Sequence, residues 1–166
     1  DTATVTLTGQ SGTVTKTVSG NDSTQVVALD SADLTMLGDG AVTISTVTTD
    51  AAGNAATADT TGGFTLDTAA PDALTVALTE DTATAADNIS SNGAVTVTGS
   101  ESGATVEYST DGGSTWGSSF TASVGGNNVT VRQTDTAGNT SATTNLIFTL
   151  DTSAAAPTVV LATDSG

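Results

Sequence analysis

Apolar and polar residues alternate along short runs of this chain, and glycine, asparagine and aspartate separate the runs. The clearest run is 94–99, in which Val95 and Val97 alternate with threonine, as expected for a strand with one buried face. Further strands are predicted at 74–79, 104–109, around Val129 and Val131, and over 141–150. Seven short strands between residues 67 and 150 favour an all-β fold of tandem immunoglobulin-like β-sandwich modules.

The aromatic residues of this stretch are expected to fill its core. Phe148 shares one predicted strand face with Leu146 and Leu150. A hairpin turn at 111–114 leads to Trp116, which we interpret as a core anchor. The alternative role for Trp116 is an exposed platform on which a sugar ring could stack.

Two phrases of the sequence return at nearly the same spacing. Thr-Leu-Asp-Thr at 65–68 recurs at 149–152, 84 positions later, and Thr49-Asp50 with Gly53-Asn54 matches Thr134-Asp135 with Gly138-Asn139, 85 positions later. A period of this length indicates a tandem array of small modules. We divide the chain into residues 1–66, a module without its first two strands; 67–150, a complete module; and 151–166, a linker and the first strand of a following module.

The first module differs from the second by an insertion. Matching Ala3-Thr4-Val5 to Ala104-Thr105-Val106 leaves about 16 extra residues in module one, which we place around 31–37. Ser31 to Leu34 are suitable for starting a single helical turn. In the last segment, Val159 and Leu161 correspond to Val76 and Leu78 of the second module.

Composition supports thin β modules and limits how they are stabilised. Only 36% of the 166 residues are hydrophobic, and there is no cysteine, which excludes disulfides and cysteine-based zinc sites. The absence of disulfides is compatible with the cytosol, but an acidic, threonine-rich tandem chain also fits an exported bacterial surface protein, which we favour. The sequence contains no signal peptide or transmembrane stretch.

The net charge of −16 narrows the possible partners. Eighteen acidic residues face only Lys16 and Arg132, so nucleic acid and anionic membranes would be repelled, and no direct membrane insertion is expected. Most of the acids are aspartates, which suit turns and hard cations bound through oxygen. Calcium is the expected ion.

Strand order predicts where the acidic side chains meet. The loop after the first strand should lie beside the exit of the module, and the turn before the last strand should lie beside its start. Converging carboxylates repel one another, and a calcium ion would remove that repulsion. The predicted ligands are Asp81, Asp87 and Asp151 at the exit of the second module, and Asp67, Asp135 and Asn139 at its start. The alternative is that aspartates only form turns, which we prefer for Asp22, Asp39, Asp59 and Asp111.

These motifs together resemble a known family. The Asp-Thr-Ala-Ala-Pro phrase at 67–71, Asp81 with 87–89, the stretch 103–113 and the phrase at 135–139 are similar in order and spacing to the bacterial Ig-like repeats of giant RTX-type adhesins. The resemblance implies type I secretion, location at the outer cell surface, and extender modules stiffened by calcium at their linkers, in support of cell adhesion and biofilm formation. Their partners would be neighbouring modules of the same chain. It assigns these modules no adhesive ligand.

Catalysis is not expected. Histidine and cysteine are absent, and Glu80 and Asp81 would point to opposite faces of an extended segment. Our leading hypothesis is therefore a structural extender that is not an enzyme. A carbohydrate- or protein-binding module is the alternative, and a cadherin-like adhesion repeat is a third possibility that lacks its expected linker motifs.

Overall fold

The computed structural model describes residues 1–20 and 23–160, and it is an almost entirely β structure. The chain divides into two compact units, Asp1–Ala69 and Ala70–Gly166. The last strand of the first unit ends at Leu66, three residues before this division, and the predicted module boundaries stay predictions. No helix in the described part of the chain is long and apolar enough to cross a membrane.

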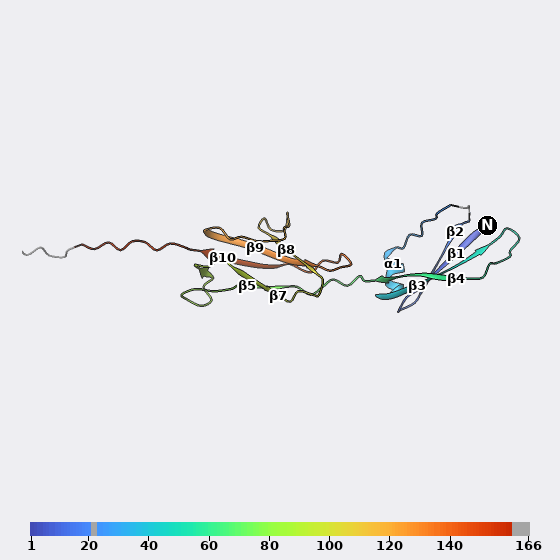
Figure 1. Ribbon diagram of the computed structural model, residues 1–166, viewed down its shortest axis with the longest axis horizontal. Helices are drawn as coiled ribbons and strands as arrows, with labels where there is room; N and C mark the ends of the chain where they lie inside the picture. The colour runs from blue at the N-terminus through green and yellow to red at the C-terminus, as the bar shows by residue number, and fades with distance from the viewer. Residues whose placement is uncertain (21–22, 161–166) are drawn as a thin grey trace, which may run out of the picture. The chain divides into compact units, whose positions relative to one another are not determined.

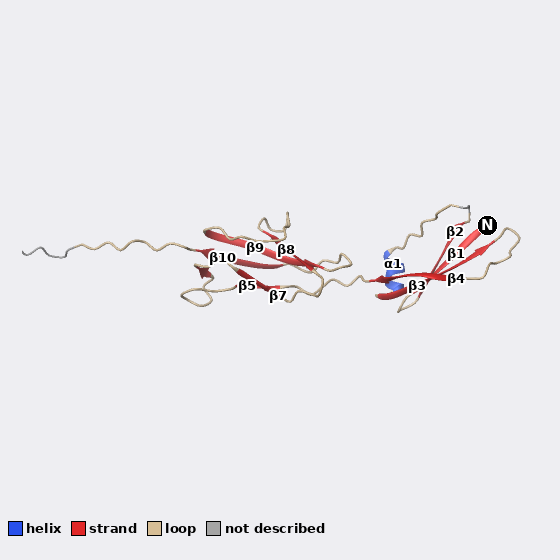
Figure 2. Cartoon of the chain, viewed as in Figure 1, coloured by secondary structure: helices blue, strands red, loops and turns tan. Residues whose placement is uncertain are grey.

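Unit 1 is built from one antiparallel sheet and one short helix (Figure 1). The strands are arranged in the order β2-β1-β3-β4, and the helix α1 lies between β2 and β3 in the chain. Figure 2 distinguishes this helix from the strands by colour. The elements are β1 (Thr2–Thr8), β2 (Thr13–Ser19), α1 (Ser31–Leu37), β3 (Gly40–Thr49) and β4 (Asp59–Leu66).

The predicted helical turn of unit 1 is present and covers one face of the sheet. Asp30 caps it, because its side chain accepts hydrogen bonds from the amides of Ala32 and Asp33. Leu37 is fully buried and packs with Leu7, Val14 and Val42 in the core of this unit. Gly9 allows the helix end to approach, since a Cβ there would lie 2.3 Å from the Leu37 carbonyl oxygen.

Unit 2 is a sandwich of two sheets (Figure 1). One sheet has the order β6-β10-β9-β8, and the other pairs β5 with β7. β6 runs parallel to β10, whereas the other pairs are antiparallel. The strands are β5 (Thr75–Leu78), β6 (Ile89–Ser90), β7 (Val95–Thr98), β8 (Thr105–Ser109), β9 (Gly125–Thr134) and β10 (Thr144–Leu150).

The core of unit 2 lies between these sheets, as the alternating pattern predicts. Leu74 and Val76 of the β5 side meet Val129 and Val131 of β9, with Phe148 and Leu150 of β10 completing the cluster. The prediction of seven strands is wrong by one among the described residues. The segment after the 111–114 turn forms only a single bridge, between Tyr108 and Gly117, because it follows the sheet edge briefly and then turns inward.

Residues 151–160 follow β10 without strand structure. Val159 is 89% exposed, and the strand predicted around it is absent from this structure. An isolated strand has no partner for its backbone groups, so it does not form alone. Leu161, the other residue assigned to that strand, lies outside the described residues.

Candidate functional site

The same acidic turn follows β3 in unit 1 and β9 in unit 2. In unit 2, Asp135 Oδ1 accepts hydrogen bonds from three backbone amides, including that of Asn139 at 2.8 Å, and Asn139 Nδ2 donates to Asp135 Oδ2 at 2.9 Å. In unit 1, Asn54 donates to Asp50 through its amide and its side chain, both at 2.8 Å. The asparagine side chain is the main reason that the pKa of each aspartate lies below its ordinary value.

This geometry bears on the metal ligands predicted at the turn. Both carboxylate oxygens of Asp135 accept hydrogen bonds from the turn itself, so the turn is held closed by its own residues. Asp67 belongs to unit 1 and Asp135 to unit 2, and the structure describes the two units separately. A shared cation bound by Asp67, Asp135 and Asn139 therefore stays a prediction.

The exits of the two units also share one geometry. Asp67 Oδ1 accepts a hydrogen bond from the Ala69 amide at 3.1 Å, and Asp151 Oδ1 accepts one from the Ser153 amide at 3.0 Å. In unit 1 the exit is fixed further, because Asp39 Oδ1 accepts hydrogen bonds from the amide and the hydroxyl of Thr68, at 2.7 and 2.8 Å. Each final strand thus ends in an aspartate that shapes the chain immediately after it.

The acidic loop between β5 and β6, residues 79–88, has an unusual backbone. Ala83, Ala86 and Asn88 adopt φ angles of 70°, 68° and 57°, in the left-handed region that residues with side chains rarely occupy. The amide of Ala86 donates to Asp81 Oδ2 at 2.5 Å. The loop is therefore wrapped tightly around the Asp81 carboxylate, at a cost in backbone strain.

The second oxygen of that carboxylate is the most informative atom of the loop. Asp81 Oδ1 is buried and forms no hydrogen bond with the described residues. A buried carboxylate oxygen without a partner is destabilising, and a hard cation is one group that would satisfy it. Calcium takes its ligands from carboxylates and backbone carbonyls in loose geometry, so this oxygen is of the kind that the ion binds.

The other predicted ligands at this end are Asp87 and Asp151. They lie on neighbouring segments of unit 2, but their carboxylates do not form a cluster with that of Asp81. Asp87 Oδ1 accepts a hydrogen bond from the Ile89 amide, and the amide of Asp151 donates to the Ser90 carbonyl at 3.0 Å. The end of the loop and the exit of unit 2 are therefore adjacent. Across residues 1–20 and 23–160, however, no three acidic side chains come close enough together to hold an ion.

Ser90 closes the base of the acidic loop. Its side chain is fully buried, and its Oγ lies 2.6 Å from the Glu80 carbonyl oxygen and 2.8 Å from that of Asn92. The same Oγ accepts a hydrogen bond from the Asn92 amide at 3.0 Å. One hydroxyl thus ties together the two ends of the loop beside β6.

Trp116 is not a core anchor, contrary to the sequence prediction. Its side chain is half-buried on the outer face of the β8–β9 sheet, where the Arg132 guanidinium lies 4.0 Å from the ring centroid. Arg132 Nε also donates to Glu107 Oε2 on the adjacent strand at 2.9 Å. The indole N–H donates to the Gly113 carbonyl at 3.0 Å, and the guanidinium occupies one face of the ring.

Asp111 shapes the hairpin before Trp116, as predicted for a turn former. It accepts hydrogen bonds from the Thr115 hydroxyl at 2.7 Å and from the amides of Ser114 and Thr115. These hydrogen bonds hold the pKa of Asp111 far below its ordinary value, and the bond from the Thr115 hydroxyl has the largest effect.

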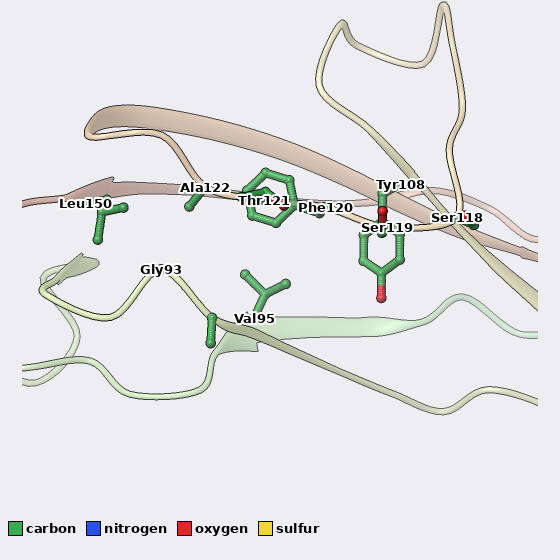
Figure 3. Close-up of a pocket in the computed structure, with 10 residues that line it drawn as sticks. Gly93, Val95, Tyr108, Ser118, Ser119, Phe120, Thr121, Ala122 and Leu150 are labelled. Atoms are coloured by element: carbon green, nitrogen blue, oxygen red, sulfur yellow. The ribbon is translucent and has the colours of Figure 1, made fainter.

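Unit 2 contains a groove at the open side of its sandwich (Figure 3). It has a volume of about 510 Å³ and is lined by Val95, Tyr108, Phe120 and Leu150, with serine and threonine hydroxyls at its rim. Gly93 closes one end, because a Cβ there would lie 2.6 Å from that of Ala122. Among the described residues, no acidic or basic side chain lines this groove, so it lacks the groups that would hold an ion.

Gln133 is an organising residue that the sequence reasoning missed. Its side chain is fully buried, donates to the Asp72 carbonyl at 2.7 Å and accepts from the Glu101 amide at 2.9 Å. It therefore fixes the incoming chain to the segment after β7. A signal was present, because Gln133 continues the inward-facing positions of Val129 and Val131 along one strand.

Comparisons with known proteins do not assign this chain to a family. No family model and no curated protein matches it. Among solved structures, it is similar to a chain from work on host cell surface retention of a 1.5-MDa bacterial ice-binding adhesin, with 24% sequence identity and a TM-score of 0.40. The match covers 93% of this chain and 55% of that chain. Similarity at this level assigns no function.

Proposed function

We propose that this chain is part of a tandem array that acts as an extracellular spacer at a bacterial surface and holds an adhesive region away from the cell. Calcium bound at the acidic loops would stiffen the modules where they join. In this role the folded module serves as a stable segment of a rod, and no catalysis is required.

The repeated exit geometry is the observation that carries this proposal. Leu66 and Leu150 end the last strands of the two units, and the aspartate after each makes the same hydrogen bond to the amide two residues further on. The turn before each of these strands is also built alike. A binding or catalytic module needs no such repetition, whereas a spacer needs each module to pass the chain on in the same way.

The acidic loop of unit 2 supports calcium as the stiffening ion. Asp81 would contribute its buried Oδ1, and Asp87 and Asp151 are the further predicted ligands at this end of the unit. When bound, the ion would supply positive charge to oxygens that otherwise repel one another. The left-handed residues of the loop would then hold the Asp81 carboxylate in place for the ion.

Thermal unfolding with and without calcium tests this site. Extracellular calcium modules bind with dissociation constants of about 10⁻⁴ to 10⁻³ M, and a tenfold excess of ion adds about 1.4 kcal/mol per site. For a unit of this size, we expect the melting temperature of unit 2 to rise by about 6–10 °C in 10 mM calcium relative to chelator. Trp116 fluorescence reports on unit 2 specifically, because the chain has a single tryptophan.

The matched variants are Asp81→Asn and Asp72→Asn. Both remove one negative charge from unit 2, but Asp72 lies at the opposite end, where the chain enters. Asp81→Asn should abolish the calcium-dependent rise, and Asp72→Asn should retain it. An unchanged melting temperature in the unaltered protein would reject the ion, and unchanged maximum dimensions in small-angle scattering with and without calcium would reject the stiffening.

A further inference from the structure

The base of the acidic loop carries an asparagine followed directly by a glycine, the only such pair in the sequence. Asn92 and Gly93 lie between β6 and β7, and both are half-buried. In such a pair the backbone nitrogen of the glycine can attack the side-chain carbonyl carbon of the asparagine. The missing Cβ leaves the approach open and lets the backbone adapt to a cyclic product. Neither residue belongs to the calcium ligands proposed above.

The Asn92 side chain is already turned toward this nitrogen. Its Oδ1 accepts a hydrogen bond from the Ala94 amide at 3.0 Å, which closes a turn that contains both Asn92 Cγ and the Gly93 nitrogen. The same hydrogen bond reaches the oxygen on which negative charge develops during the attack, so it stabilises the transition state. Within residues 1–20 and 23–160, the Gly93 amide donates no hydrogen bond and is therefore available to react.

The reaction needs only water as a co-reactant. The Gly93 nitrogen loses its proton to the solvent and forms a bond with Asn92 Cγ, while the bond from Cγ to Nδ2 breaks and ammonia leaves. Water then opens the cyclic imide at either of its carbonyl groups. The product is an aspartate, or the isomer in which the backbone runs through the side-chain carboxyl group. In both products a neutral amide has become a carboxylate.

This change would reverse the sign of one interaction at the base of the loop. Asn92 Nδ2 donates to Glu80 Oε2 at 3.1 Å and so helps Ser90 to hold the two ends of the loop together. A carboxylate in place of that donor would face the Glu80 carboxylate and repel it. In the isomer, the lengthened backbone would also displace Ala94, whose carbonyl accepts a hydrogen bond from the Thr79 amide at 2.9 Å.

Asn127 lacks this arrangement and serves as an internal comparison. It is half-buried like Asn92, but its Oδ1 accepts a hydrogen bond from the amide of Ser123, earlier in the chain. The residue after it, Asn128, has a side chain and lies in β9, opposite Ile147 of β10. A cyclic product at Asn127 would distort this ladder, so similar exposure does not give similar reactivity.

We propose that Asn92 and Gly93 form a self-modifying site, at which deamidation replaces a hydrogen bond across the base of the acidic loop with a repulsion between carboxylates. The stability of unit 2 would then decrease as the protein ages. The inference goes beyond the spacer function and does not depend on it, because the reaction uses only residues of this loop and water.

Ageing of the full chain in chelator at mildly alkaline pH tests the proposal. Peptide mass spectrometry should show conversion at Asn92 well before any at Asn127. The conversion should be faster at higher pH, because the Gly93 amide must lose its proton. The urea midpoint of Trp116 fluorescence should fall as the converted fraction rises. Conversion of Asn127 as early as that of Asn92, or an unchanged midpoint after conversion, would overturn the inference.

Two variants separate the reaction from its consequence. Asn92→Asp places the carboxylate in the fresh protein, so its urea midpoint should be low from the start and should not fall further on ageing. Glu80→Gln should convert at Asn92 as the unaltered protein does but lose less stability, since the opposing charge is gone. It also provides the reading if Asn92→Asp fails to fold. An equal loss of stability on conversion with Glu80 and with Gln at this position would contradict the repulsion.

Discussion

Units 1 and 2 share a central sheet arrangement but cover it with different elements. The strand order β1-β3-β4 in unit 1 corresponds to β8-β9-β10 in unit 2, with the same Asp–Asn turn before the last strand of each. Unit 1 covers this sheet with α1, and unit 2 covers it with the β5–β7 pair. The turns and exits are thus constant between the units, whereas the covering layer differs.

The residue two positions before the aspartate of the turn illustrates this difference. Gln133 in unit 2 is fully buried and binds the backbone of the covering layer, whereas Thr48, two residues before Asp50, is exposed. Unit 1 instead joins its cover to the sheet through an ion pair between Lys16 on β2 and Asp33 on α1, at 2.6 Å. A covering layer of strands needs hydrogen-bond partners outside each strand for its backbone groups. A helix forms most of these hydrogen bonds within itself.

The helix cover of unit 1 gives the largest expected effect. Leu37→Ala removes its fully buried side chain from a core of four buried residues, so we expect a loss of about 3 kcal/mol, enough to unfold a small unit. Circular dichroism should lose the signal of unit 1, while the urea midpoint of Trp116 fluorescence stays unchanged. Met36→Ala, on the exposed side of α1, is the control. A matching shift in the Trp116 midpoint would show that the units do not fold independently.

Gln133 provides the corresponding test of the strand cover. Gln133→Leu keeps the volume but leaves the Glu101 amide and the Asp72 carbonyl without partners, so unit 2 should lose about 2–3 kcal/mol. The change is measured as a lower urea midpoint of Trp116 fluorescence. Thr48→Ala at the corresponding position of unit 1 should change stability by less than about 0.5 kcal/mol. Equal, small effects at both positions would contradict the role given to Gln133.

The shared turns give the smallest effect, and it should appear in both units. The folded-state pKa values of Asp50 and Asp135 lie below the ordinary value of an aspartate, so their contribution to stability is present above that ordinary value and is lost as the pH falls through the folded-state pKa. Urea midpoints should therefore decrease below about pH 4. Asp135→Asn should weaken this pH dependence in unit 2 alone, and Asp50→Asn in unit 1 alone. Identical pH profiles for the variants and the unaltered protein would contradict it.

The sequence predicted those elements whose signals are local. Strands predicted at 74–79, 94–99 and 104–109 are found at 75–78, 95–98 and 105–109, and the inserted helix occupies 31–37. The two-residue β6 was not predicted, because its pairing with β10 depends on a contact about 60 positions away. Trp116 was misplaced, since its preference for the core is overridden by Arg132 on the adjacent strand.

The candidate site was predictable only in part. Aspartates at recurring turn positions could be identified from the sequence, and so could the proximity of the acidic loop to the exit of unit 2. The sequence does not show which carboxylate oxygen lacks a partner, because the burial of Asp81 Oδ1 depends on how three left-handed residues fold the loop around it.

The different covers of the two units also affect how neighbouring modules fold. Adjacent repeats of similar sequence can exchange equivalent strands while they fold and so become trapped as misassembled pairs. Here α1 packs Leu37 against the sheet of one unit, whereas β5 and β7 cover the corresponding face of the sheet in the other. The face covered by the helix offers no equivalent place to β5 or β7, which disfavours exchange of these strands between the two units of a nascent chain.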